Sequence, residues 1–235
     1  MKTSPSRKKA QISGLYAIAD EAWNPFQGFR PLILKFLQGG AKIVQLRMKN
    51  SSPGEVRRDA LLIAALKKDF DFTFILNDHA DIAAEVGADG VHVGENDEPV
   101  ADIKKRHGER LIVGYSSHSI DEAHSAQSAG ADYIAFGAIF HTMTKGPGHP
   151  VQGIEKLRAL AASVSLPVVA IGGICRENIR DVISAGADSV AMITALSQAS
   201  DISGEVAYYS KMFDDVSSLT GKGLSPGCSR GQCGK

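Results

Sequence analysis

The sequence predicts an α/β fold of one domain, a closed (βα)₈ TIM barrel, and two observations carry this prediction. Eight short runs rich in apolar and β-branched residues alternate with segments whose apolar residues have helical spacing. Such alternation is typical of a parallel sheet covered by helices. In addition, a glycine-alanine pair recurs before every second strand, which indicates repeated double units and favours a closed barrel.

The predicted strands are short and regularly spaced along the chain. They cover residues 14–20, 41–49, 71–78, 90–96, 111–117, 132–140, 167–173 and 189–194. The segments between them, such as EVRRDALLIAALKKDF and ENIRDVISAG, have the apolar spacing of surface helices. Ser119 and Glu122 form a capping-box pattern where the helix after the fifth strand should begin.

The repeated pair lies between the end of a helix and the start of the second, fourth, sixth or eighth strand. It comprises Gly40, Gly87, Gly130 and Gly186, each followed by Ala and then by Asp or Lys. Glycine at this place fits the left-handed conformation that commonly ends a helix. An open doubly wound sheet would need no eighth strand and would usually carry a Gly-rich loop after the first, where this chain reads LYAIADEAWN.

The predicted barrel spans residues 14–218, with tails at residues 1–13 and 219–235. Cys228 and Cys233 in the second tail could pair or hold a metal, but further Cys or His ligands are not nearby, so we expect a solvent-exposed end.

The charges balance, with 26 basic and 26 acidic residues, so no global field draws the chain onto nucleic acid or an anionic membrane. No stretch approaches the roughly 20 apolar residues of a membrane span, and the start MKTSPSRKKAQ lacks a signal-peptide pattern. A cytoplasmic location is therefore expected, and association into a homo-oligomer stays open.

Polar residues at the ends of barrel strands are candidates for function, because active sites of this fold lie there. At the end of the second strand, Gln45, Arg47 and Lys49 alternate with Leu46 and Met48. Period-two spacing puts the three polar side chains on one face, which we expect to point inward, with the apolar pair toward the helices. Two inward cations need an anion such as phosphate or pyrophosphate. The alternative is a solvated strand end.

Asp78 and Asp97 follow the third and fourth strands. Two carboxylates at one rim suit a hard cation that also binds phosphate oxygens, as Mg²⁺ usually does. Asp78 alone could instead cap the helix that follows it.

Two further segments point to phosphate. The loop HTMTKGPGHP, residues 141–150, combines hydroxyls, a lysine and glycines, and is predicted to be a phosphate-binding lid; the alternative is an ordinary long loop. The run AIGGI, followed by a helix, offers backbone N–H groups to a phosphate.

Among the histidines, His92 lies in the middle of a strand and is expected to be a packed core residue, whereas His118 and His141 lie at the rim. Nothing in the sequence resembles a nucleophile with its base, so the site is expected to act by positioning and electrostatics.

Taken together, these segments resemble thiamine-phosphate synthase from Tyr16 to about Gln198. The matching pieces are QLRMK, ILNDHADIA, GADGVHVGENDEP, VGYSSHS, GADYIAFGAIFHTMTKGPGHPVQG, VVAIGGI and VAMITAL. The resemblance implies a barrel enzyme that joins a hydroxymethylpyrimidine diphosphate to a thiazole phosphate, giving thiamine phosphate and pyrophosphate. It also implies one Mg²⁺ per subunit, held by Asp78 and Asp97.

The resemblance also implies two sets of ligand-binding residues and one catalytic set. The pyrimidine diphosphate set is Gln45, Leu46, Arg47, Met48, Lys49, Asn77, Ser116 and Lys145. The thiazole phosphate set is Thr142, Met143, Thr144, Gly173, Ile193 and Thr194. The catalytic set is Arg47, Lys49, Lys145 and Ser116, of which the three cations would neutralise the departing pyrophosphate.

Four positions depart from the usual pattern of that family. Met48 replaces a common Glu, Glu95 a common Gln, His141 a frequent Pro and Thr194 a common Ser. Rival interpretations are a thiazole tautomerase of the same family, a non-catalytic barrel that binds thiamine phosphates, and a sugar-phosphate isomerase using Asp78 with His118.

Overall fold

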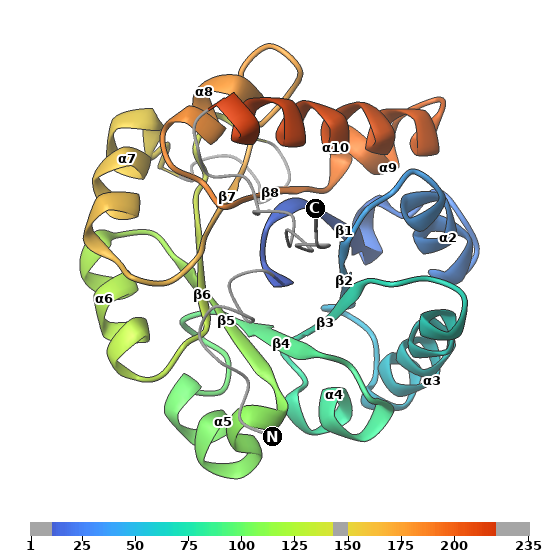
Figure 1. Ribbon diagram of the computed structural model, residues 1–235. Helices are drawn as coiled ribbons and strands as arrows, with labels where there is room; N and C mark the ends of the chain where they lie inside the picture. The colour runs from blue at the N-terminus through green and yellow to red at the C-terminus, as the bar shows by residue number, and fades with distance from the viewer. Residues whose placement is uncertain (1–10, 143–149, 220–235) are drawn as a thin grey trace, which may run out of the picture.

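The computed structural model describes residues 11–142 and 150–219. Its eight strands are parallel and form a closed barrel in the order β1 to β8, with β8 pairing with β1 (Figure 1). The strands are β1 Gly14–Asp20, β2 Ile43–Arg47, β3 Thr73–Asn77, β4 Gly90–Val93, β5 Ile112–Ser117, β6 Tyr133–Phe136, β7 Val168–Ile171 and β8 Ser189–Met192. The predicted (βα)₈ fold is confirmed.

Helices form the outer ring of Figure 1, with the strands inside it. They are α2 Arg30–Gln38, α3 Pro53–Ala64, α4 Ala80–Val86, α5 Val100–His107, α6 Ile120–Ser128, α7 Gly153–Ser163, α8 Ile179–Ser184, α9 Thr194–Ser197 and α10 Ile202–Leu219. Short 3₁₀ turns are η1 Glu21–Trp23, η2 Ala65–Lys68 and η3 Gly108–Arg110.

Alternate strand residues build two separate hydrophobic clusters. Tyr16, Ile43, Ile75 and Tyr133 belong to the cluster inside the barrel. A larger cluster, with residues such as Leu46, fills the space between strands and helices. The inner cluster also contains Ile12, which is fully buried, although the sequence analysis assigned residues 1–13 to a tail.

The repeated glycines adopt the left-handed conformation that was predicted. Gly40, Gly87, Gly130 and Gly186 have φ values of +91°, +77°, +96° and +112°.

The aspartates that follow three of these glycines have a structural function that the sequence analysis did not foresee. The backbone N–H of Phe74, Val113 or Val168 donates to the side chain of Asp89, Asp132 or Asp188 respectively, at 2.7, 2.8 and 3.0 Å. In each case the aspartate's own N–H donates to the carbonyl of the same strand residue. Each aspartate thus ties the start of its strand to the start of the preceding strand, on the side of the barrel away from the candidate site.

Two helix starts show how closely local sequence predicts a cap. Ser52 and Glu55 make a complete capping box at α3. At α6, Ser119 Oγ accepts the N–H of Glu122, but the Glu122 carboxylate accepts the N–H of His118 instead of that of Ser119. The predicted pattern therefore does cap the helix, with its return bond shifted by one residue.

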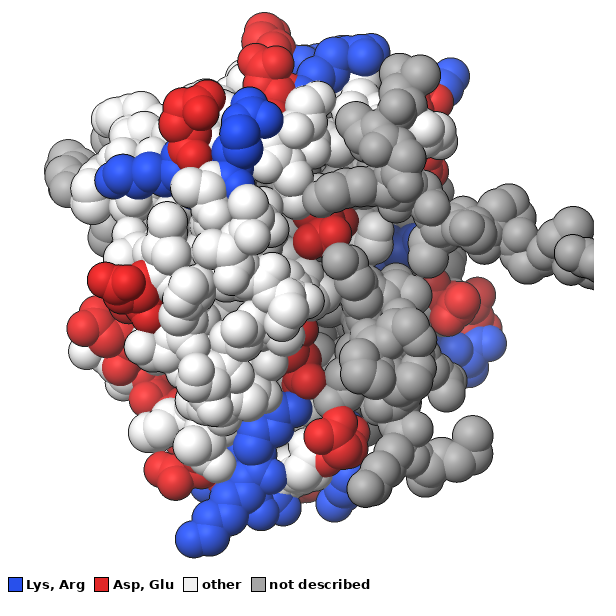
Figure 2. Space-filling view, turned by 60° about the vertical axis from the view of Figure 1, so that its left-hand side comes forward, with Lys and Arg blue, Asp and Glu red and all other residues white. Residues whose placement is uncertain are grey.

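Figure 2 shows the side of the molecule that lies on the left of Figure 1. Separate acidic and basic side chains surround a broad area of uncharged residues there. None of the helices in the described ranges is both long and apolar enough to cross a membrane.

Candidate functional site

A cavity of about 240 Å³ opens at the carboxyl ends of the strands. Its lining includes the predicted residues Gln45, Arg47, Lys49, Asn77, Asp78, Asp97 and Ser116. The structure thus brings together seven side chains from β2, β3, β4, β5 and the loops that follow them. We call this cavity the polar pocket.

A second cavity of about 90 Å³ adjoins the first, and we call it the small pocket. Thr142, Gly173, Ile193 and Thr194 line it, all of which the resemblance assigned to thiazole phosphate. The two pockets have common lining residues, namely Ile171, Ala191 and Ile193. Two ligands bound in the pockets would therefore meet across a wall of aliphatic side chains.

Successive side chains of β2 and the residues after it point alternately to the polar pocket and to the helices. Gln45, Arg47 and Lys49 line the polar pocket. Leu46 is fully buried and Met48 is 7% exposed, both within the outer cluster that packs against helices. Their side chains therefore cannot contact a ligand in the pocket, which limits Leu46 and Met48 to backbone contacts in the pyrimidine diphosphate set.

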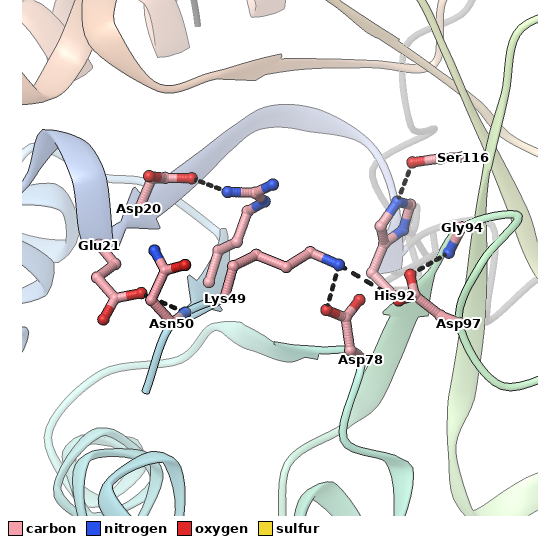
Figure 3. A network of polar contacts seen from close by, with 10 residues as sticks. Asp20, Glu21, Lys49, Asn50, Asp78, His92, Gly94, Asp97 and Ser116 are labelled. Carbon is pink, nitrogen blue, oxygen red and sulfur yellow. Dashed lines mark hydrogen bonds and ion pairs between the residues drawn. The ribbon is translucent and has the colours of Figure 1, made fainter. Parts of the chain in front are cut away.

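Arg47 is held by Asp20, a residue that the sequence analysis missed. Its Nη1 lies 2.5 Å from Oδ2 of Asp20, whose side chain is 2% exposed and is labelled in Figure 3. The other carboxylate oxygen of Asp20 accepts the N–H of Ala22. Asp20 ends β1, so it occupies the same kind of strand-end position that identified the other candidates. A search of all eight strand ends would have found it.

The neighbouring Glu21 braces the loop that follows β2. Its carboxylate accepts the hydroxyl of Ser51 at 2.6 Å and the N–H of Asn50 at 2.8 Å. These two hydrogen bonds hold the pKa of Glu21 below its usual value. The end of β1 thus positions both Arg47 and the segment that carries Lys49.

Lys49 lies between the two predicted metal ligands. Its Nζ is 2.5 Å from Asp78 Oδ2 and 3.3 Å from Asp97 Oδ1. Figure 3 draws both contacts as dashed lines. Asp97 is fixed further by the N–H of Gly94, at 2.8 Å. Asp78 has φ +64°, the left-handed conformation, and its N–H donates to the carbonyl of His92. Such backbone strain in a non-glycine residue is often found at functional sites.

The proximity of these charges shifts their pKa values. Burial and the nearby Asp97 raise the pKa of Asp78, against the effect of Lys49. Burial opposes ionisation of Asp97 too, but the N–H of Gly94, with Asp78 and Lys49, outweighs it and lowers that pKa. Burial would lower the pKa of Lys49, but the two carboxylates outweigh this effect and raise it. Asp78 and Asp97 together therefore stabilise a positive charge that lies between them.

The donor set at this point fits a magnesium ion that arrives with a phosphorylated ligand. Both carboxylates bind one ammonium group, so their oxygens face a common point. Within the described ranges there is no group of three or more His, Cys, Asp or Glu side chains able to hold a metal. Mg²⁺ is commonly held by one or two carboxylates and completes its shell with water and phosphate oxygens.

Asn77 brings an unpartnered donor to the polar pocket. The residue is 7% exposed, and its buried Nδ2 has no hydrogen-bond partner among the described residues. Leaving a buried donor unpaired costs about 1–3 kcal/mol. Such a cost is expected where a ligand supplies the missing acceptor.

A chain of hydrogen bonds crosses the barrel, and most of its residues line the polar pocket. Gln45 Nε2 donates to the hydroxyl of Tyr16 at 2.9 Å, and the hydroxyls of Tyr16 and Tyr133 are 3.0 Å apart. His92 joins Tyr133 through Nδ1 at 2.9 Å and Ser116 through Nε2 at 2.8 Å. His92 is 8% exposed, in line with its expected burial, but it also connects Ser116, which lines the pocket, to the buried Tyr133.

The small pocket depends on two glycines. Gly172 and Gly173 have φ values of +102° and +65°. A Cβ atom on Gly172 would lie 2.6 Å from Cβ of Ala138, and one on Gly173 would lie 2.4 Å from the carbonyl oxygen of His141. The helix expected directly after AIGGI begins later, at Ile179, and Asn178 instead braces the loop by donating to the carbonyl of Gly173.

Other predicted residues have separate positions. His118 lines the polar pocket, and its Nδ1 donates to the carbonyl of Gly137 at 2.8 Å. Glu95 lines the same pocket and is exposed, as is His141. The remaining predicted residues Met143, Thr144, Lys145, Cys228 and Cys233, and most of the proposed lid, lie outside the described ranges.

Comparison with known proteins gives consistent results. The family model described as thiamine monophosphate synthase matches residues 15–196. A thiamine-phosphate synthase of Halalkalibacterium halodurans is 38% identical over 200 residues, which cover 85% of this chain and 95% of that protein. The Nitrosospira multiformis thiamine-phosphate synthase is 39% identical over 214 residues, or 91% of each chain. The solved thiamine phosphate pyrophosphorylase from Pyrococcus furiosus has 34% identity and a TM-score of 0.80, covering 89% of this chain and 98% of that one.

Proposed function

The chain belongs to the thiamine monophosphate synthase family, and we propose on this basis that it is a transferase that makes thiamine phosphate. Its substrates are 4-amino-2-methyl-5-hydroxymethylpyrimidine diphosphate and 4-methyl-5-(2-phosphooxyethyl)thiazole, and its second product is pyrophosphate. The observation that carries the proposal is the pair of adjoining pockets, one charged and one small, with a common aliphatic wall.

The polar pocket suits the diphosphate substrate. Arg47 and Lys49 supply positive charge, and Ser116 supplies a hydroxyl. Gln45 and Asn77 offer amide groups at the inner end, where an aromatic ring with polar edges would be oriented. The small pocket, with its two glycines and Thr194, would take the thiazole phosphate. We assign Lys145 to the diphosphate, and Met143 and Thr144 to the thiazole phosphate, by resemblance alone.

The proposed reaction breaks the bond between the methylene carbon of the pyrimidine and the diphosphate oxygen, which keeps the electron pair. The lone pair of the thiazole nitrogen then forms the new carbon–nitrogen bond. Arg47 and Lys49 stabilise the charge that develops on the departing oxygens, and the two pockets hold the partners within reach of each other. A protein nucleophile is not required for this exchange.

A magnesium ion, held by Asp78 and Asp97 when the diphosphate binds, would neutralise charge on the phosphate oxygens. Asp20 would keep the guanidinium of Arg47 in place during this step, because its other oxygen is fixed by the N–H of Ala22.

Three rival functions are less well supported. A tautomerase acting on thiazole phosphate, or a barrel that only binds thiamine phosphates, has no need for Arg47, Lys49, Asp78 and Asp97 around one cavity. A sugar-phosphate isomerase would need a paired acid and base, whereas Asp78 binds Lys49 and His118 binds Gly137.

The proposal is tested by incubating the purified protein with both precursors and Mg²⁺ and following thiamine phosphate by mass spectrometry. We expect product that disappears with chelator and falls by on the order of 100-fold or more in Asp97→Asn, because charge stabilisation of the leaving group is lost. Asp215→Asn, an exposed carboxylate on α10, is the matched control and should retain full activity. Absence of product with wild-type protein, combined with isomerisation of the thiazole precursor, would establish the tautomerase instead.

A further inference from the structure

We propose that Tyr16, Tyr133 and His92 are positioning residues that set the hydrogen-bonding direction of two pocket residues. Through them Ser116 becomes a donor toward the ligand, and Gln45 becomes an acceptor. The identity of the ligand rests on the proposed function, but the order of the hydrogen bonds does not.

The direction follows from counting protons along the chain. Tyr16 accepts the N–H of Gln45, so its own proton can go only toward Tyr133 among the contacts in this chain. Tyr133 accepts that proton and must place its own on Nδ1 of His92. Burial raises the pKa of both phenols, so each keeps a proton that needs an acceptor.

The neutral ring of His92 then carries its proton on the other nitrogen. With Nδ1 accepting from Tyr133, Nε2–H donates to Oγ of Ser116. The serine hydroxyl, having accepted this bond, directs its own proton away from the histidine and into the polar pocket that Ser116 lines. A diphosphate oxygen, which only accepts hydrogen bonds, is the kind of group that this donor suits.

The other end of the chain has the opposite character. Gln45 commits one N–H of Nε2 to Tyr16, which fixes the orientation of its amide and offers Oε1 to a ligand. An amide oxygen accepts hydrogen bonds, so it suits the N–H of an amino-substituted aromatic ring. The two ends of one chain therefore recognise the two different parts of a single ligand, the anionic group and the ring.

Packing holds the chain in this arrangement. Tyr16 and Tyr133 are 2% and 0% exposed, and the rings of His92 and Tyr133 stack with centroids 5.5 Å apart. Gly114 makes room for the phenol, since a Cβ atom there would lie 2.4 Å from the Tyr133 hydroxyl. Tyr133, which links Tyr16 to His92, is fully buried and does not line the polar pocket, so bulk water has no direct access to this middle link of the chain.

Nitrogen-15 NMR of histidine-labelled protein tests the direction without any activity measurement. The two ring signals of His92, identified by their loss in His92→Gln, should show a protonated Nε2 and an unprotonated, hydrogen-bonded Nδ1. In Tyr133→Phe the Nδ1 signal should move to the position of an unbonded nitrogen. Tyr209→Phe, which removes another buried phenol in α10, should leave both signals unchanged.

A double-mutant cycle then tests the coupling to the site. Tyr133→Phe should lower kcat/KM for the pyrimidine diphosphate by on the order of tenfold, the size of one hydrogen bond. In a Ser116→Ala background the same change should have clearly less effect, because the serine that it positions is gone.

The NMR experiment and the double-mutant cycle each have an outcome that would contradict the proposal. A proton on Nδ1 of wild-type His92 would overturn the proposed direction, and it can be observed even if Tyr133→Phe does not fold. Additive effects in the cycle would show that the phenol affects kcat/KM independently of Ser116, which would overturn the proposed coupling. If the wild-type protein makes no thiamine phosphate, the proposed function fails, while the NMR result still stands or falls by itself.

Discussion

The side chain of Asn77 places a buried amide donor in the polar pocket without a partner among the described residues. An unpaired buried donor destabilises the fold, so its removal should be favourable to folding. We expect Asn77→Leu, of similar volume, to raise the free energy of unfolding by about 1 kcal/mol while kcat/KM falls by on the order of 100-fold.

Chemical denaturation and steady-state kinetics would measure both effects. Ser189→Ala provides the contrast, because that fully buried hydroxyl does have a partner and donates to the carbonyl of Gly14 at 2.8 Å. It should lose stability and keep its activity. A loss of stability in Asn77→Leu would show that the amide supports the fold.

Asp20 is expected to act through Arg47. In Asp20→Asn the side chain can still accept the N–H of Ala22, but the charge that holds the guanidinium is gone. We expect KM for the pyrimidine diphosphate to rise roughly tenfold, as for one charge-assisted hydrogen bond, with KM for the thiazole phosphate unchanged. A fall in KM for the diphosphate would mean that the charge of Asp20 mainly weakens the attraction between Arg47 and the diphosphate. Its effect on the position of Arg47 would then be minor.

At the level of single residues, sequence periodicity predicted most of the polar pocket. The alternation in QLRMK placed Gln45, Arg47 and Lys49 on the inner face, since a strand has only two faces. Tyr16 and Tyr133 could not be found in this way, because an inward tyrosine in a strand has the same pattern as an ordinary core residue. Their hydroxyls gain a role only through contacts between strands that lie far apart in the sequence.

Among the elements, the aspartates that join neighbouring strands lie at the ends opposite the candidate site. Asp132 binds the N–H of Val113 and pairs with the largely buried ammonium of Lys104. Asp132→Asn should lower the free energy of unfolding by about 3 kcal/mol, because a buried cation loses its partner.

Thermal unfolding would detect this change, and kcat and both KM values should stay near wild type, since the substitution lies far from the pockets. Asp121→Asn, at the exposed start of α6, is a matched control that should leave stability within about 0.5 kcal/mol. A large loss of activity in folded Asp132→Asn would show that the two ends of the barrel are coupled.

The strands and helices were predictable because their periods differ and because glycine marked the helix ends. Strand ends were less predictable: residues 48–49, 94–96 and 137–140 were assigned to strands but lie beyond β2, β4 and β6. These residues turn away from the sheet to form the rim, so apolar content alone extended the strands too far. The burial of Ile12 could not be predicted for a related reason, since only the closed barrel creates the interior that buries it.

For the molecule as a whole, metal and ligand binding should be linked to stability. Because two carboxylates face the metal position among the residues that the structure describes, Mg²⁺ alone should bind weakly and hardly change the melting temperature. Mg²⁺ together with pyrophosphate, at about 100 times the dissociation constant, should raise it by roughly 5–10 °C.

Differential scanning fluorimetry with Mg²⁺, pyrophosphate and both would measure this linkage. Lys49→Ala should reduce the combined shift, since the ammonium contacts both acids and would also contact the anion. An equal shift with Mg²⁺ alone would indicate a metal site made entirely by the protein.

The aliphatic wall between the two pockets bears on the fate of a short-lived electrophile. In the proposed reaction, the electrophilic pyrimidine carbon would form next to Ile171, Ala191 and Ile193, whose aliphatic side chains have no lone pair to offer. The ratio of thiamine phosphate to hydrolysed pyrimidine then depends on whether thiazole or water reaches the carbon first. The aliphatic wall therefore protects fidelity because it does not react with the electrophile, and the reactivity of the neighbouring ligand decides which product forms.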